Sequence, residues 1–155
     1  MNDIISAQDD WRRAEQLGEK RASQMLANSL NKKQSAEINS SDGKSYYDNG
    51  RLKMELVRKG INNSLRSYDE SGILVEEARI DSISGKYQGI YKQYYRSGNI
   101  AIQGYYNEET PYGKWMEYYD NNKGQLREEY EFESGQKQGS DKYYHANGQL
   151  WTERI

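Results

Sequence analysis

The sequence is poor in the residue types on which most enzymes and metal sites depend. Its 155 residues include no cysteine, one proline and one histidine, His145. Without cysteine there are no disulfides, thiolate nucleophiles, iron–sulfur clusters or cysteine zinc sites. Any Ser-His-Asp arrangement would have to use His145, and two-histidine metal motifs are excluded. We therefore expect a non-catalytic protein with no cofactor and no metal site.

Aliphatic core residues are also scarce. Leu, Ile, Val and Phe together supply 23 residues, about 15% of the chain, which is low for a globular domain. Fifteen Tyr and three Trp compensate, because an aromatic ring buries a large area while keeping a polar end. This composition favours a thin, tyrosine-faced sheet over a thick oily core.

Long apolar runs and an excess of one charge are missing as well. The longest apolar stretches are a few residues, which excludes a transmembrane helix. Asp3 in the opening segment is atypical of a secretory signal, so we expect a cytoplasmic protein, or a periplasmic one if a signal was removed. The 22 basic and 24 acidic residues are intermixed along the chain. This balance excludes nucleic acid as an expected ligand and offers anionic lipid little attraction.

From residue 43 onward the chain repeats a short pattern five times. Each copy has a tyrosine before a glycine, an aliphatic residue two positions after that glycine, and Glu or Gln five positions after it. The tyrosines of this column are Tyr46, Tyr68, Tyr94, Tyr118 and Tyr144. Pairs such as Asn49-Gly50 and Ser97-Gly98 predict two-residue hairpin turns, and the fourth copy has a longer loop. Residues 43–155 are therefore expected to form an elongated, open antiparallel sheet of about ten strands in five hairpins.

Centring each turn on its glycine pair predicts the register. Basic residues then face Glu or Gln across each hairpin, and a one-residue slip would break every such pair. The predicted pairs are Lys44–Glu55, Arg66–Glu77, Lys92–Gln103 and Lys142–Glu153. The register that these pairs support also predicts which residues lie on the same face of the sheet.

The same register sorts the aromatic residues onto two faces. The face predicted to be buried pairs Tyr47 with Leu52, Tyr95 with Ile100, Tyr119 with Leu126 and His145 with Leu150, and also carries Tyr91 and Trp115. The other face carries the tyrosine column, the charged pairs and Trp151. Its rings are expected to be half-hydrated, in keeping with a surface that packs on neighbours and meets water.

Three fragments carry a resemblance to a known family. They are Gly113-Lys-Trp-Met-Glu-Tyr-Tyr119 with Gly124-Gln-Leu126, Gly89-Ile-Tyr-Lys-Gln-Tyr-Tyr95 with Gly98-Asn-Ile100, and Tyr143-Tyr-His-Ala-Asn-Gly-Gln-Leu150. They resemble MORN repeats, specifically the variant of bacterial YwqK-type antitoxin proteins. The resemblance implies successive hairpins and a binding role, often as the antitoxin or immunity partner of a toxin. The second and fifth copies depart from the pattern, with Asp69 and His145 at the second tyrosine position.

Residues 1–42 differ from the repeats. Ile4, Ala7, Trp11, Ala14 and Met25 recur at three- and four-residue spacing, which predicts helical structure over residues 3–30, as one helix with a weak middle or as two shorter helices. A polar linker is expected over 31–42. An open sheet leaves its apolar face wet unless something covers it. We expect this helix to cap the first repeat; the alternative is that it projects toward a partner.

Three functional hypotheses follow. The leading one is an immunity protein or antitoxin that neutralises a cognate protein toxin by stoichiometric binding. The second is a scaffold that self-associates through the sheet ends or the N-terminal helix, and the third is a peripheral membrane module. The expected partner-binding residues are Tyr94, Tyr118, Tyr144 and Trp151, with Tyr91, Tyr95, Trp115 and Tyr119 on the opposite face as the alternative set. His145 is not expected to be catalytic.

Overall fold

The computed structural model describes residues 42–59, 63–121 and 123–155. The predicted helix and linker of residues 1–42, and the proposed cap, lie outside the described residues except for Asp42. Among the residues that the structure describes, none forms a helix of the length and apolar character that crossing a membrane requires.

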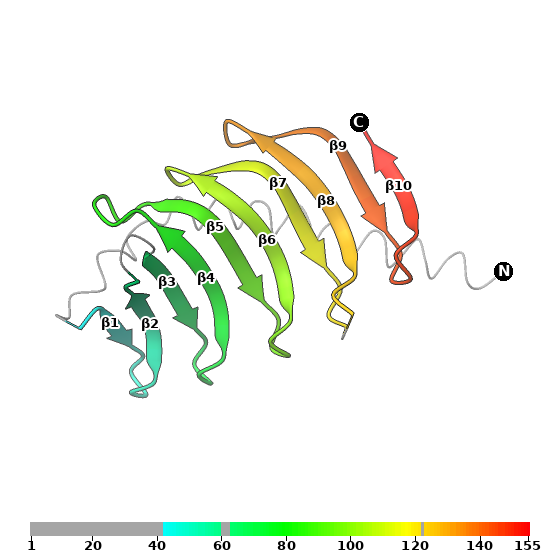
Figure 1. Ribbon diagram of the computed structural model, residues 1–155. Helices are drawn as coiled ribbons and strands as arrows, with labels where there is room; N and C mark the ends of the chain where they lie inside the picture. The colour runs from blue at the N-terminus through cyan, green and yellow to red at the C-terminus, as the bar shows by residue number, and fades with distance from the viewer. Residues whose placement is uncertain (1–41, 60–62, 122) are drawn as a thin grey trace. The chain divides into compact units, whose positions relative to one another are not determined.

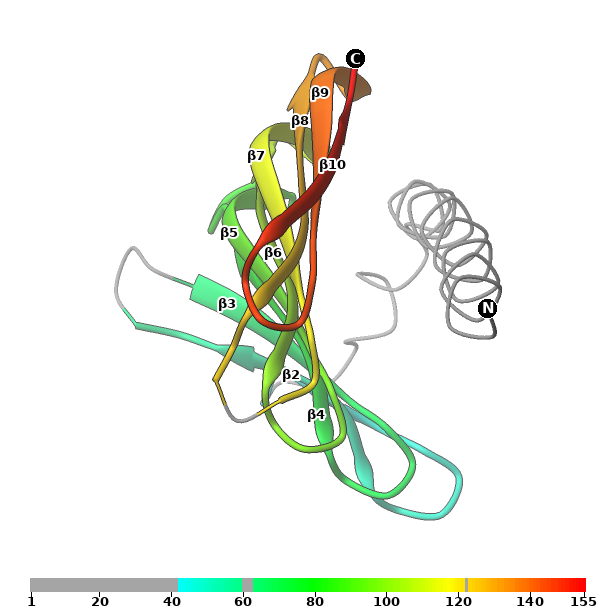
Figure 2. The same ribbon diagram turned by 90° about the vertical axis from the view of Figure 1, so that its right-hand side faces the viewer.

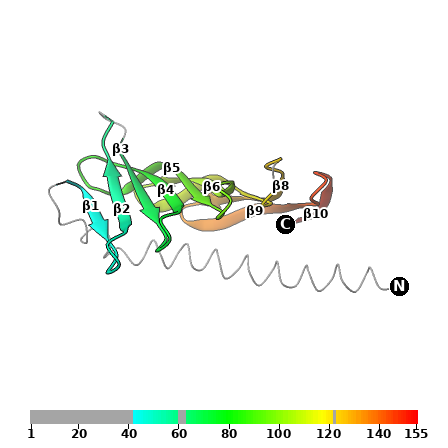
Figure 3. The ribbon, with the colours of Figure 1, turned by 90° about the horizontal axis from the view of Figure 1, so that it is seen from below.

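The described strands form one antiparallel sheet, in which each strand pairs with its neighbours in sequence (Figure 1). The predicted open sheet is thus confirmed. Figures 2 and 3 show how strongly the strand direction rotates from the first hairpins to the last, as the twist of successive strands accumulates. The strands are β1 (Lys44–Tyr46), β2 (Leu52–Val57), β3 (Asn63–Tyr68), β4 (Leu74–Ile80), β5 (Tyr87–Tyr94), β6 (Ile100–Asn107), β7 (Thr110–Tyr118), β8 (Leu126–Glu133), β9 (Gln136–Tyr144) and β10 (Leu150–Arg154).

The predicted cross-strand pairs are confirmed, but the predicted turns are wrong. Lys44 lies opposite Glu55, and the other three predicted pairs are also in register. In the first hairpin, however, the Tyr47 N–H donates to the Arg51 carbonyl and the Gly50 N–H donates to the Tyr47 carbonyl, both at 2.8 Å. This is a three-residue loop with Gly50 in the left-handed region at φ 79°. The loops at 69–73, 95–99 and 145–149 repeat the pattern.

A β-bulge next to each turn restores the predicted register. Tyr46 pairs with Leu52 while Ser45 pairs with Met54, so Lys53 is an extra residue in β2. The equivalent extra residues in the other hairpins are Val75, Ala101, Arg127 and Trp151. The three-residue loop and the bulge each shift the pairing by one, in opposite senses. The turn prediction missed both the third loop residue and the bulge, and because these two errors cancel, the predicted register is correct beyond the bulge.

The bulges change the predicted faces near the turns. We call the side that carries Tyr46, Tyr68, Tyr94, Tyr118 and Tyr144 the outer face, and the side that carries Met54, Tyr91 and Trp115 the inner face. The aliphatic residue two positions after each turn glycine pairs directly with the column tyrosine and lies on the outer face. The prediction that it pairs with the residue after that tyrosine is therefore wrong. The corrected residues are Leu52, Ile100, Leu126 and Leu150.

The inner face is buried, as predicted for Tyr91 and Trp115, which are 3% and 1% exposed. The rings form a continuous row, with centroids 5.6 Å apart for Tyr91 and Trp115 and 5.7 Å apart for Trp115 and Phe132. Trp115 lies over Gly104, where an added Cβ would be 2.2 Å from the indole. The aromatic residues thus supply the core that aliphatic residues are too few to build.

Candidate protein-interaction surface

The outer-face tyrosines are held in place by carboxylates of the preceding hairpin. The Tyr68 hydroxyl donates to Glu55 at 2.6 Å, and the Tyr144 hydroxyl donates to Glu129 at 2.9 Å. Tyr94 donates to Glu77 at 3.3 Å. We call this set of hydroxyl–carboxylate contacts the Tyr–Glu ladder. It explains why both columns recur in the sequence, because each rung needs one residue from each of two hairpins.

One rung of the ladder is replaced. The fourth hairpin follows a hairpin that has Gln103 in place of glutamate, and the Tyr118 hydroxyl donates instead to the Met116 sulfur at 3.5 Å. Tyr118 is half-buried, like Tyr94 and Tyr144. The three tyrosines predicted to bind a partner therefore lie on one face, with rings fixed by their neighbours.

Charged pairs lie beside the Tyr–Glu ladder, and the pKa values of Arg66 and Tyr68 are raised there. Arg66 donates to Glu77 at 2.9 Å and lies 3.9 Å from Glu55, and the hydrogen bond to Glu77 raises the pKa of Arg66. Burial, together with the bond to Glu55, raises the pKa of Tyr68 to about 12. The tyrosine therefore stays protonated and donates throughout the physiological pH range.

Beyond the charged pairs, the outer face carries an apolar row that the sequence analysis missed. Ile90 pairs with Tyr105, and Tyr105 pairs with Tyr112. These side chains are 42%, 43% and 59% exposed, respectively. Alternation from Lys92, Gln103 and Tyr118 could have placed all three on this face, but the pairing of Tyr112 with Tyr105 depends on an irregular register between β6 and β7 near Gly113, which has a φ of 67°. We call Ile90, Tyr105 and Tyr112 the outer apolar row.

The alternative set on the other face is less available. Tyr91 and Trp115 are core residues. Tyr95 and Tyr119 are half-buried, and their hydroxyls donate to the carbonyl oxygens of Tyr118 and Tyr144 at 2.7 and 2.8 Å. These two tyrosines therefore join successive turns.

Trp151 does not lie with the tyrosine column. As the extra residue of the last bulge it shares with Thr152 the position opposite Tyr143, and its ring lies 5.7 Å from that of His145. It is 43% exposed. The structure thus separates Trp151 from Tyr94, Tyr118 and Tyr144, with which the sequence grouped it.

The inner face also contains carboxylates, and each is engaged within the fold. Glu117, 2% exposed, contacts Arg127 and accepts a hydrogen bond from Tyr130 at 3.1 Å. Glu128 is 3.2 Å from Lys137, and burial, followed by repulsion from Glu117, raises the pKa of Glu128. Within the described ranges, no group of three or more His, Asp or Glu side chains is arranged to hold a metal ion.

Buried tyrosines satisfy another of these carboxylates. Tyr87 and Tyr91 donate to Glu76 at 3.0 and 2.9 Å, and burial raises the pKa of Glu76. Such contacts meet the hydrogen-bonding needs of a charge inside an aromatic core. They account for Glu76 by its structural contacts.

Comparison with solved structures shows a fold similarity. The chain is similar to S. aureus TarM, in a mutant crystallised with fondaparinux, alpha-GlcNAc-glycerol and UDP, with a TM-score of 0.52 and 12% identity over 76% of this chain. A second TarM structure has a TM-score of 0.48 and 16% identity over 68% of this chain. The chain spans 26% and 23% of the lengths of these proteins. At such identity the similarity concerns the fold alone.

Comparison with known sequences identifies a repeat. No curated protein matches the chain. Residues 87–108, which comprise β5, its turn and β6, match the model of the MORN repeat variant. This match supports a MORN-repeat protein, and a MORN repeat suggests a protein-binding or structural module.

Proposed function

We propose that the chain is a non-catalytic protein-binding module that presents its outer face to a partner protein. The outer apolar row supports this proposal. Ile90, Tyr105 and Tyr112 are exposed next to one another on three paired strands. Interfaces are enriched in such aromatic residues and surround them with a polar rim.

The surroundings of the row meet this description. Lys114 and Glu131 lie opposite each other beside it, and Lys92 and Gln103 separate it from the ladder. Tyr94 and Tyr118 lie further along the same face. A partner could therefore bury apolar area at the row while exchanging hydrogen bonds and ion pairs around it.

We propose that the partner is a cognate protein toxin and that binding neutralises it. The support for this choice is the resemblance of the repeats to those of YwqK-type antitoxins. A fixed, preformed surface suits neutralisation by capture, because little conformational entropy is lost when it binds.

The test begins with purification from the native host and identification of the co-purifying protein. That protein is then titrated with the chain at fixed concentration while its toxic activity is measured. Protection that saturates near equivalence supports capture, and His145→Ala should protect equally well. Full protection at a small substoichiometric amount would indicate turnover and contradict the proposal.

A further inference from the structure

Three of the four junctions between successive hairpins follow one rule, and the junction between β6 and β7 departs from it, with Gln103 opposite Met116. A glutamate on the second strand of one hairpin lies opposite a basic residue on the first strand of the next: Glu55 opposite Arg66, Glu77 opposite Lys92, and Glu129 opposite Lys142. At these three junctions the same glutamate also accepts the hydroxyl of the next hairpin's column tyrosine. Each of these three junctions therefore joins a strand that carries a glutamate to a strand that carries a basic residue and a tyrosine.

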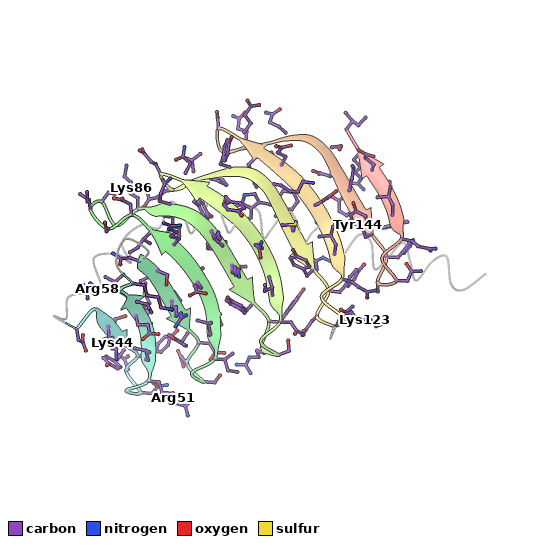
Figure 4. All side chains as sticks on the ribbon, in the orientation of Figure 1. Lys44, Arg51, Arg58, Lys86, Lys123 and Tyr144 are labelled. Atoms are coloured by element: carbon purple, nitrogen blue, oxygen red, sulfur yellow. The ribbon has the colours of Figure 1, made fainter. Side chains whose placement is uncertain are left out.

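The two terminal strands of the described sheet carry the same complementary residues, with the glutamate on one strand and the basic residue and tyrosine on the other. β1 and β10 are the terminal strands of the described sheet (Figure 1). β1 carries Lys44 and Tyr46 at the positions that Arg66 and Tyr68 hold in β3, and Figure 4 labels Lys44 at this end. β10 carries Glu153 at the position that Glu129 holds in β8.

Tyr46 differs from the rest of its column in a way that this arrangement explains. It is 54% exposed, whereas Tyr68, Tyr94, Tyr118 and Tyr144 are half-buried. Within the described part of the chain no hairpin precedes it to supply the glutamate of a rung. At the other end, Glu153 lies 3.9 Å from Lys142 of its own hairpin, and no described strand follows to supply a second partner.

We propose that copies of this chain associate head to tail, with β10 of one copy pairing antiparallel with β1 of the next. Glu153 then lies opposite Lys44 of the second copy and accepts the hydroxyl of its Tyr46. Thr152 lies opposite Ser45, as Met54 lies opposite Ser67. The contact continues the sheet by the rule that already joins three of its hairpin junctions. In forming it, the Lys44 backbone N–H exchanges its hydrogen bond to the Asp42 carboxylate, 3.1 Å, for one to the second copy.

The geometry of this contact has a consequence for the size of the assembly. The two surfaces differ from each other, so every added copy leaves one open end of each kind. Such a contact builds rings when the rotation closes and filaments when it does not. β1 has only three residues, so the association should be weak and dependent on concentration.

Charge reversal at the two ends tests the proposal. Light scattering over a range of concentrations should show species larger than a dimer. Lys44→Glu and Glu153→Lys should each weaken association by about tenfold or more, since like charges then face each other. An equimolar mixture of the two variants should restore association, because each variant supplies the end that the other needs. Rescue by mixing also excludes misfolding as the cause.

Three outcomes would overturn the proposal. One is a chain that stays monomeric at all accessible concentrations. Another is loss of association in Glu153→Lys alone, without rescue by Lys44→Glu, which would indicate pairing between two β10 strands. Association only with a different protein would likewise show that the ends serve another partner.

A disulfide measures the register directly. Because the chain has no cysteine, Ser45→Cys and Thr152→Cys proteins mixed under a thiol oxidant can form only the disulfides that their contacts allow. The proposal predicts a mixed dimer as the main product. Ser45→Cys mixed with Gln136→Cys, an exposed position on β9, is the matched control. Equal yields in both mixtures would contradict the proposed pairing.

Discussion

The Tyr68 hydroxyl donates a 2.6 Å hydrogen bond to the Glu55 carboxylate, although the two residues belong to different hairpins. The contact shows how the repeated columns hold this sheet together. Tyr68, Tyr94 and Tyr144 each donate to a glutamate of the previous hairpin. Loss of the hydroxyl should therefore affect stability only where a glutamate receives it.

Tyr68→Phe should lower the free energy of unfolding by about 1 to 2 kcal/mol, because a hydrogen bond to a charged group is lost while the ring is kept. Chemical denaturation measures the change. Tyr46→Phe is the matched control, since no hydrogen bond to its hydroxyl is present in the described part of the chain. Equal losses in both variants would contradict the role of the ladder.

Gly104→Ala should destabilise the fold by at least about 1 to 3 kcal/mol, because the new Cβ would lie 2.2 Å from the Trp115 ring and force the core apart. Thermal unfolding checks this. Its neighbour Gln103, on the outer face, is the control, and Gln103→Ala should change stability by less than about 0.5 kcal/mol. An unchanged midpoint for Gly104→Ala would show that Trp115 can move aside freely.

Arg127→Ala should cost about 3 kcal/mol, because it leaves the buried Glu117 carboxylate without its cation. The double variant Glu117→Gln/Arg127→Ala should recover part of this loss, since the uncompensated charge is then gone. Urea denaturation of both variants measures the difference. A double variant that is less stable than Arg127→Ala would argue against this account.

Asp69 makes stability depend on acid pH. Hydrogen bonds from the Ser71 hydroxyl and from the backbone at Ile73 lower the pKa of Asp69 from its ordinary value of 3.8 to about 2. Because the folded-state pKa is the lower one, the contribution is complete above the ordinary value and is lost as the pH falls from about 4 to about 2. The stability difference between the wild type and Asp69→Asn should shrink over this window when unfolding is followed against pH. A stability difference that stays constant over this pH window would contradict the role of Asp69.

Tyr105→Ala and Tyr112→Ala should each weaken binding of the identified partner by about 2 kcal/mol if they anchor the interface. Calorimetric titration measures the affinity, and unfolding curves confirm that each variant is folded. Ile83→Ala, at a 95% exposed position in the turn after β4, is a control that should bind normally. Unchanged affinity in both tyrosine variants would move the interface off the outer apolar row.

The repeat columns in the sequence were sufficient for the sheet, its strand order and its register. Each column reflects a contact that recurs between neighbouring hairpins, such as Lys44 opposite Glu55. Local alternation also predicted that Tyr91 and Trp115 would share the buried face. These features depend only on the two-residue period of a strand, which is legible in the sequence.

The tertiary structure decided the turns, the bulges and the exposed row. Loops of two and three residues can carry the same Asn-Gly or Ser-Gly pair, and only the hydrogen bonds of the fold distinguish them. The bulge then placed Trp151 beside His145 and away from Tyr144. An irregularity around Gly113 likewise brought Tyr112 beside Tyr105. One extra residue reverses the side to which a strand residue points. The faces of the residues near each bulge therefore follow from the strand pairing in the structure, because alternation in the sequence does not reveal the bulge.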